Sequence, residues 1–564
     1  MAAASAPDAS RRWLFGPVPD LLLGCGGAHV LLVLLFALPV VQQGVDPWLV
    51  LGAALISQVT NTPHYGATLL RVYEHRSERR RFALFSVWIT LALIGLFVAG
   101  LHWALLGSIL LTAYATWSPW HFSGQNYGLS LMLLRRRGVD VDAGTKRLFY
   151  ASFLLSFALT ALLLHTEAGT IALAPVPAAV SGQYTFLSLG LPDTFSRAIF
   201  PLLGGAYLAV VGATGMRLLR EGGTLRDLAP AAALVATQAL WFSFPALLRY
   251  MDAFTTENIA FGAFGVSIAH SVQYLWVTSY YAVNADRGER VGSFLGKTLL
   301  AGAAVVVFPA LLFAPGLLGT VPFNAGLGIL LFSVVNLHHF ILDGAIWKLR
   351  DGPVARVLLR SPSEAAPAAE QAVDTRGPWR TAVFAAGALA FGVAVFHAFE
   401  IEFGINRALR SRDLARVDEA TRHLRWIGRA DYRIHQQLAD ALAQETWRRA
   451  VADGSAGRDT DFSDALAHYE ESLRIYESAP AWLGLGNVRY TQGDYAGARE
   501  AYEAVLRVNP RHFRALNRLG ELWLAQGDLV RARASLERAA ALAPRDARIR
   551  TALERLAEAE RLGG

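Results

Sequence analysis

Long apolar stretches recur along the chain as far as residue 401 and are separated by short polar connections. About 20 consecutive apolar residues suffice for a helix to cross the hydrocarbon core of a membrane. Beyond the last stretch the chain is dense in Arg, Glu and Asp, which indicates a second, water-exposed domain. The pattern predicts eleven membrane-spanning helices, at residues 21–42, 48–70, 83–104, 106–134, 147–166, 197–218, 228–248, 257–283, 296–317, 323–347 and 380–401.

The apolar stretches and the charged region that follows them predict an all-α protein, in which a polytopic bundle of about eleven transmembrane helices is followed by a helical domain. We expect a cytoplasmic N-terminal segment over residues 1–20, a multi-pass transmembrane domain over residues 21–401 and a separate domain over residues 402–564. The composition agrees, because 54% of the 564 residues are hydrophobic and only 17% are charged, an unusual balance for a soluble domain of this length. The single cysteine, Cys25, excludes an intramolecular disulfide and a cysteine-based metal site.

Basic residues are unevenly distributed between the two sets of loops. With the N-terminus in the cytoplasm, the even-numbered spans lead into loops that together hold 22 Lys and Arg, whereas the opposite loops hold Arg197 and Arg249. Positive charge favours the cytoplasmic side, so the bias predicts a multi-pass protein of the cytoplasmic (inner) membrane with a cytoplasmic N-terminus. An odd number of spans then places the C-terminal domain outside the cytoplasm. Since the basic loops serve orientation and no nucleic-acid motif is present, we expect no nucleic-acid partner.

The C-terminal part repeats itself with a period of 34 residues. The pairs with this separation are Gly486 and Gly520, Gly493 and Gly527, Asp494 and Asp528, Ala498 and Ala532, and Pro510 and Pro544. This pattern over residues 481–544 resembles tetratricopeptide repeats, with an earlier copy at 459–480 and a closing helix at 545–561. The resemblance implies an α-solenoid of stacked helix hairpins, whose groove binds a protein or peptide partner.

Five histidines stand in polar phrases inside predicted spans: His64, His121, His270, His338 and His339. An imidazole is costly in a bilayer, so a set of them indicates a function rather than contact with lipid. The four spans that carry them all run toward the cytoplasm in the predicted topology, and the five residues fall in its cytoplasmic half. We therefore predict one shared site, with all five as candidate metal ligands.

Three polar residues follow these histidines by four positions and share their helix faces, namely Gln125, Tyr274 and Asp343. We expect them to take part in catalysis, either by orienting a ligating imidazole or by contacting substrate. Adjacent residues diverge by about 100° around a helix, so only one of His338 and His339 faces a common centre. The spacing to Asp343 favours His339.

The donor set is rich in imidazole and lacks thiolate, which suits iron, copper or zinc. We expect Fe²⁺, because open coordination positions on iron allow O₂ activation beside a lipophilic substrate that enters from the bilayer. His29, in the first span, stays open as a further ligand.

Two of the histidine phrases resemble a known family. The phrases are Pro63-His64-Tyr65-Gly66 and His121-Phe122-Ser123-Gly124, each with an additional residue before its glycine. They resemble the Pro-His-Gly and His-Phe-Gly phrases of the membrane β-carotene dioxygenases of bacteria and archaea. The resemblance implies that His64 and His121 are iron ligands and that the reaction is oxidative cleavage of a polyene.

Three functional hypotheses follow, and whether the chain is an enzyme stays open among them. The first is a metal-dependent, iron-containing membrane oxidoreductase that acts on an isoprenoid or another lipid and carries a protein-binding repeat domain. The second is a membrane carrier or channel whose buried histidines handle protons or a polar solute. The third is a lipid-linked glycosyltransferase fused to tetratricopeptide repeats, for which the first outer loop supplies a single acidic residue, Asp46.

Overall fold

The computed structural model divides into two compact units, one ending at Ala398 and the other running from Phe399 to the C-terminus. Outside the described residues lie residues 1–11 of the predicted N-terminal segment, parts of three predicted spans (37–42, 307–317 and 323–325) and Asp46. Where the chain is described, regular structure is helical, which confirms the all-α prediction. The described residues are 12–36, 47–74, 76–166, 184–253, 256–285, 289–306, 326–348, 352–359, 378–510, 512–544 and 546–563.

The long helices of the first unit overlap the predicted spans, and the short helices at Pro17–Pro19, Arg76–Arg81 and Gly352–Leu359 lie outside them. The first predicted span is broken at Cys25 and Gly26, where Gly26 adopts a φ of 82° that favours glycine. The N-terminal half of the unit contains α2 (Pro17–Pro19), η1 (Asp20–Gly24), α3 (Gly27–Phe36), α5 (Pro47–Tyr73), α6 (Arg76–Arg81), η2 (Leu84–Ile89), α7 (Thr90–His102), α8 (Ala104–Arg136) and α9 (Ala143–Leu164). The remainder contains α10 (Asp193–Arg220), α11 (Leu225–Gln238), η4 (Ala239–Ser243), α12 (Phe244–Tyr250), α13 (Thr256–Ala285), α14 (Val291–Val306), α16 (Leu327–Ile346), α17 (Gly352–Leu359) and α18 (Pro378–Phe399).

Among the described helices, six are long and apolar enough to cross a membrane. They differ strongly in burial. In α16, 78% of an apolar stretch of 18 residues is buried, whereas the corresponding share in α10 is 17%. On α10, Leu202 and Leu208 are each 69% exposed. Such exposure of large apolar side chains suits contact with lipid, so α10 is peripheral and α16 is central. The six segments are Leu84–His102, Ala143–Leu164, Asp193–Arg220, Leu225–Tyr250, Leu327–Ile346 and Pro378–Ser411.

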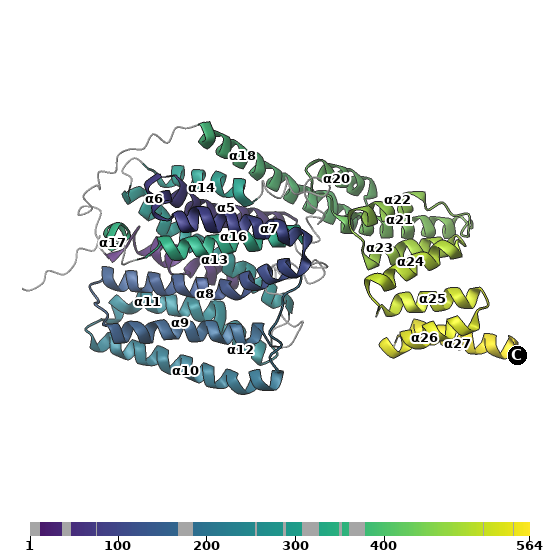
Figure 1. The fold of residues 1–564 in the computed structure, drawn as a ribbon, viewed down its shortest axis with the longest axis horizontal. Helices are drawn as coiled ribbons and strands as arrows, with labels where there is room; N and C mark the ends of the chain where they lie inside the picture. Colours follow the sequence, from purple (N-terminus) through teal and green to yellow (C-terminus); the bar gives the residue numbers. More distant parts are fainter. Residues whose placement is uncertain are drawn as a thin grey trace, which may run out of the picture. The chain divides into compact units, whose positions relative to one another are not determined.

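The long helices of the first unit run roughly parallel or antiparallel to one another, with α9 between α8 and α10 (Figure 1). The central helix α16 packs against α5, α7 and α8, and α5 also packs against α13 and α14. The closest approach is between α5 and α14. A Cβ atom on Gly66 would lie 1.8 Å from the carbonyl oxygen of Thr298, and one on Gly302 would lie 1.8 Å from that of Thr62. Only glycine permits this backbone contact, which is typical of tightly packed membrane helices.

The second unit is a series of helix hairpins that explains the 34-residue period. At the turns, Gly493 and Gly527 have φ near 78° and 79°, and the following Asp494 and Asp528 cap the next helix. Its helices are η6 (Glu400–Asn406), α19 (Arg407–Ser411), α20 (Leu414–Trp426), α21 (Tyr432–Ala452), α22 (Ser463–Ile475), α23 (Ala479–Thr491), α24 (Tyr495–Val508), α25 (Phe513–Ala525), α26 (Leu529–Leu542) and α27 (Ala547–Gly563).

Candidate metal centre

Four helices of the first unit each contribute one histidine to a common cluster. These are His64 on α5, His121 on α8, His270 on α13 and His339 on α16. The ring centroids of His64 lie 4.1 Å from His339 and 4.8 Å from His270, and those of His121 lie 5.2 Å from His270 and 5.3 Å from His339. Four of the predicted ligands are therefore neighbours in space, although more than 270 residues separate the first from the last.

Asp343 joins this cluster through one carboxylate oxygen. Its Oδ2 lies 3.4 Å from His339 Nε2 and 4.0 Å from His121 Nε2. Potential ligand atoms form two groups, each within 4.8 Å: His64, His270 and His339, and His121, His339 and Asp343. His339 belongs to both. Asp343 was predicted to orient a ligand or contact substrate, and its geometry also suits it to ligate a metal directly.

The imidazole nitrogens of the cluster are buried and lack hydrogen-bond partners. This holds for both ring nitrogens of His64 and His270, and for Nε2 of His121 and His339. The exposed fraction is 2% for His64, 1% for His270 and 2% for His339. A buried polar atom without a partner costs free energy, and native proteins rarely leave several together. A metal ion between the rings would satisfy one nitrogen of each imidazole, so the residues fit a metal centre.

The Nδ1 atom of His339 belongs to a hydrogen-bond network around Thr68. The Thr68 hydroxyl donates to Asp343 Oδ1 at 2.9 Å and lies 2.9 Å from His339 Nδ1 and 2.7 Å from the Tyr274 hydroxyl. Tyr274 donates to the same Oδ1 at 2.7 Å and accepts a bond from Trp347 Nε1 at 2.8 Å. Because Thr68 gives its only proton to the carboxylate, His339 Nδ1 must be the protonated nitrogen, which leaves Nε2 free to bind a metal.

Sequence reasoning did not identify Thr68. It follows His64 by four residues, the same separation that pointed to Gln125, Tyr274 and Asp343. The spacing rule would have found it, but a threonine in a helix commonly bonds its own backbone and carries little signal by itself.

Gln125 lies beside the cluster, but its side chain bonds to Gln273 and to the backbone of His270 and not to an imidazole ring. Its amide donates to Gln273 Oε1 at 2.5 Å and to the carbonyl oxygen of His270 at 3.4 Å. Gln273 in turn donates to the carbonyl of Gly24 at 2.8 Å. Gln125 therefore joins α8 to α13, and Gln273 joins α13 to the N-terminal segment.

Aromatic rings close the cluster on two sides. Phe122 stacks on His270 with centroids 4.0 Å apart, and Phe340 stacks on His121 with centroids 4.3 Å apart. Both lie next in sequence to a histidine of the cluster. Apolar walls of this kind keep water out and strengthen electrostatic interactions inside the site.

Two other histidines considered from the sequence lie apart from the cluster. His338 Nε2 is 2.8 Å from the hydroxyl of Thr90 on α7, so the ring points away from that of His339. His29 Nδ1 accepts a bond from Trp241 Nε1 at 2.9 Å. Neither belongs to the two groups of candidate ligands among the described residues. The rotation of about 100° per residue in a helix separates His338 from His339.

Comparison with known proteins concerns the repeat domain. The tetratricopeptide repeat family matches residues 455–500 and 483–547. The chain is 35% identical over 71 residues to the "Protein CTR9 homolog" of Arabidopsis thaliana, covering 12% of this chain and 6% of that protein. It is 29% identical over 92 residues to the "Photosystem I assembly protein Ycf3" of Cyanophora paradoxa, covering 16% of this chain and 53% of that protein. The chain thus spans about half or less of the length of these relatives, and its C-terminal region contains tetratricopeptide repeats, as the 34-residue period predicted.

Proposed function

We propose that this chain is a membrane metalloenzyme that binds iron at the histidine cluster and oxidises a lipophilic substrate. The observation that carries the proposal is the convergence of four imidazoles from four helices, each with at least one buried ring nitrogen that has no hydrogen-bond partner. No hydrogen-bonding role accounts for nitrogens that make no hydrogen bond. Intramembrane ionisable groups are also functional as a rule.

The donor set supports iron over the other metals. His121, His339 and Asp343 together form a two-histidine, one-carboxylate group, the ligand set typical of non-haem iron oxygenases. His64 and His270 would be further ligands. When bound, iron would supply O₂ activation. An isoprenoid substrate, and cleavage of the kind performed by β-carotene dioxygenases, rest on the two similar histidine phrases.

The chain's own residues prepare this site. Thr68 keeps the proton of His339 on Nδ1, and Tyr274 holds Asp343 by its other oxygen. Phe122 and Phe340 exclude water from the two imidazoles on which they stack. Contacts of this kind fix the orientation of metal-ligating side chains.

We also propose the topology that the basic loops favour. The N-terminus lies in the cytoplasm, the chain crosses the inner membrane, and the repeat domain lies outside the cytoplasm and binds a protein partner. Cysteine accessibility scanning of intact cells, with single cysteines placed in the α6 segment and in the repeats, tests this sidedness.

A second candidate function is a carrier that handles protons. The observation in its favour is the continuous chain of hydrogen bonds from Trp347 through Tyr274, Asp343 and Thr68 to His339. Proton-coupled flux by a metal-free protein in liposomes would favour this alternative over the metalloenzyme.

Metal analysis of the purified full-length chain tests the first proposal. We expect stoichiometric iron in the wild type and loss of iron in H64A and in H339A. The matched control is H338A, which removes the adjacent imidazole outside the cluster and should retain the metal. A wild-type protein that takes up no metal even when reconstituted anaerobically with Fe²⁺ would refute the proposal.

A further inference from the structure

A cavity is lined by residues of α5 and α16 other than His64 and His339. It has a volume of about 920 Å³ and is bordered by α5, α6, η2, α7, α14, α16 and α18. This volume falls within the range of small-molecule sites. Most of the lining is aliphatic or aromatic, including Leu93, Ile94, Phe97, Leu331 and Val335. Its occupant must therefore be largely apolar.

One end of the cavity carries charge. Glu74, Arg79 and Arg380 line it, and Glu74 forms an ion pair with Arg380 at 3.0 Å. Among the described residues, no carboxylate pairs with Arg79, because the nearby Glu78 pairs with Arg71 and Arg81. The three charged groups that line this end therefore sum to one positive charge, which matches a ligand with a single negative charge.

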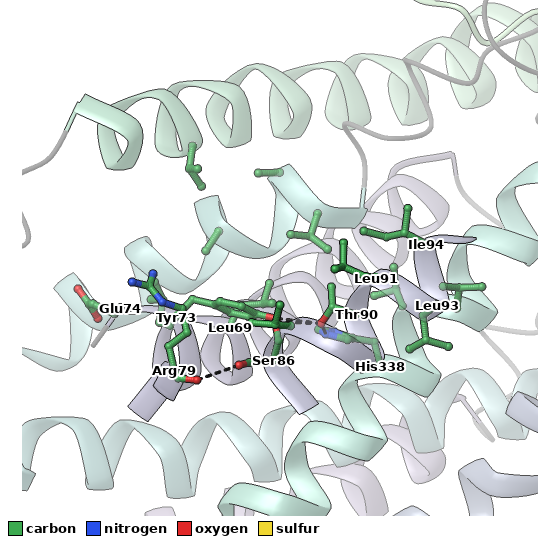
Figure 2. Close-up of a pocket in the computed structure, with 18 of the residues that line it drawn as sticks. Leu69, Tyr73, Glu74, Arg79, Ser86, Thr90, Leu91, Leu93, Ile94 and His338 are labelled. Carbon is green, nitrogen blue, oxygen red and sulfur yellow. Dashed lines mark hydrogen bonds between the residues drawn. The ribbon is translucent and has the colours of Figure 1, made fainter. Parts of the chain in front are cut away.

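Between the two ends, the polar groups of the wall are bonded to each other. The Tyr73 hydroxyl donates to the carbonyl of Ser86 at 2.6 Å and lies 3.0 Å from the Thr90 hydroxyl, which lies 2.8 Å from His338 Nε2 (Figure 2). Since these groups already have partners, the wall makes little demand for a polar ligand group beyond the charged end. His338 therefore lines this cavity and bonds to Thr90, and it is not one of the candidate metal ligands.

We propose that this cavity binds a long-chain fatty acid, with its carboxylate at Arg79 and its hydrocarbon chain along α7 and α16. A guanidinium binds a carboxylate by charge-assisted hydrogen bonds, and the apolar lining buries the chain. A phosphate or diphosphate head would bring more negative charge than this end neutralises. The proposal does not depend on a metal in the histidine cluster, because the cavity and the cluster share helices but no lining residue.

Photocrosslinking tests the site in the full-length chain in nanodiscs of phosphatidylcholine, with a diazirine analogue of palmitate as the probe. We expect label on peptides from 84–102 and 327–346 that unlabelled oleate removes, and that oleyl alcohol, which lacks the charge, removes only at about tenfold higher concentration or more. In R79Q, the concentration of oleate that removes the label should rise by a similar factor. The matched control is R80Q, which alters an exposed arginine outside the lining.

A second variant, V335W, fills the apolar part of the cavity and should abolish specific label at both peptides. Its metal content and elution from size exclusion should match the wild type, which separates loss of the lipid site from misfolding or from failure of the metal centre. Label spread evenly over lipid-facing helices such as α10, or equal competition by oleate and oleyl alcohol, would show ordinary bilayer contact and overturn the proposal. Tighter competition by lysophosphatidate than by oleate would overturn the carboxylate assignment.

Discussion

Replacing Thr68 with valine is the sharpest test of how the protein prepares His339 for metal binding. Valine has nearly the shape of threonine but lacks the hydroxyl, so T68V removes the contacts to His339 Nδ1, Asp343 Oδ1 and the Tyr274 hydroxyl. The imidazole then loses the acceptor for its Nδ1 proton, and the alternative tautomer, with the proton on Nε2, becomes competitive. That tautomer cannot bind a metal through Nε2.

The expected magnitude follows from the bonds removed. A hydrogen bond to a charged or metal-polarised group contributes about 1.5–3 kcal/mol, and loss of a group that orients a metal ligand typically costs about tenfold to a hundredfold in affinity. We therefore expect iron to bind T68V ten to a hundred times more weakly than the wild type, in keeping with about 1.4 kcal/mol for each factor of ten. Titration of the protein against a competing Fe²⁺ chelator measures this difference.

Two further variants make the measurement specific. T68S restores the hydroxyl and should bind iron as the wild type does. T278V removes a buried hydroxyl from α13 that donates to the carbonyl of Tyr274 at 2.8 Å and makes no contact with the cluster. Equal affinities for T68V and T278V would refute the assigned role of Thr68.

Two other predictions concern packing and pH. G302A should lower the thermal midpoint in detergent, because the new methyl group meets the carbonyl oxygen of Thr62 and overpacking of this kind costs about 1–3 kcal/mol; G124A, where a Cβ meets nothing within 4 Å, should not lower it. In the repeat domain, burial, reinforced by the neighbouring His468, lowers the pKa of His435 from 6.5 to about 4. The unfolded state therefore takes up the proton first as the pH falls, and the free energy of unfolding should drop by about 2 kcal/mol from pH 7 to pH 5. Hydrogen exchange of α21 in the full chain measures this drop, and a pH-independent exchange free energy in the wild type would contradict it.

The amino-acid sequence by itself determined the helices and their spacing. Runs of apolar residues predicted where the long helices of the first unit lie, because a run of about 20 apolar residues forms a helix that is long enough to cross a membrane. The 34-residue period predicted the repeats, since each hairpin needs glycine and aspartate at its turn, as at Gly493 and Asp494. Helix periodicity also placed Asp343 on the same face as His339.

Tertiary structure alone decided which helix faces meet. Periodicity tells which residues share a face, but the partner of that face depends on side-chain shape and on close backbone approaches such as that of Gly66 to Thr298. For this reason the sequence did not reveal the network at Thr68, and it could only favour His339 over His338 as the residue that enters the cluster. The cavity at Arg79 was invisible for the same reason, because its wall is assembled from helices far apart in the chain.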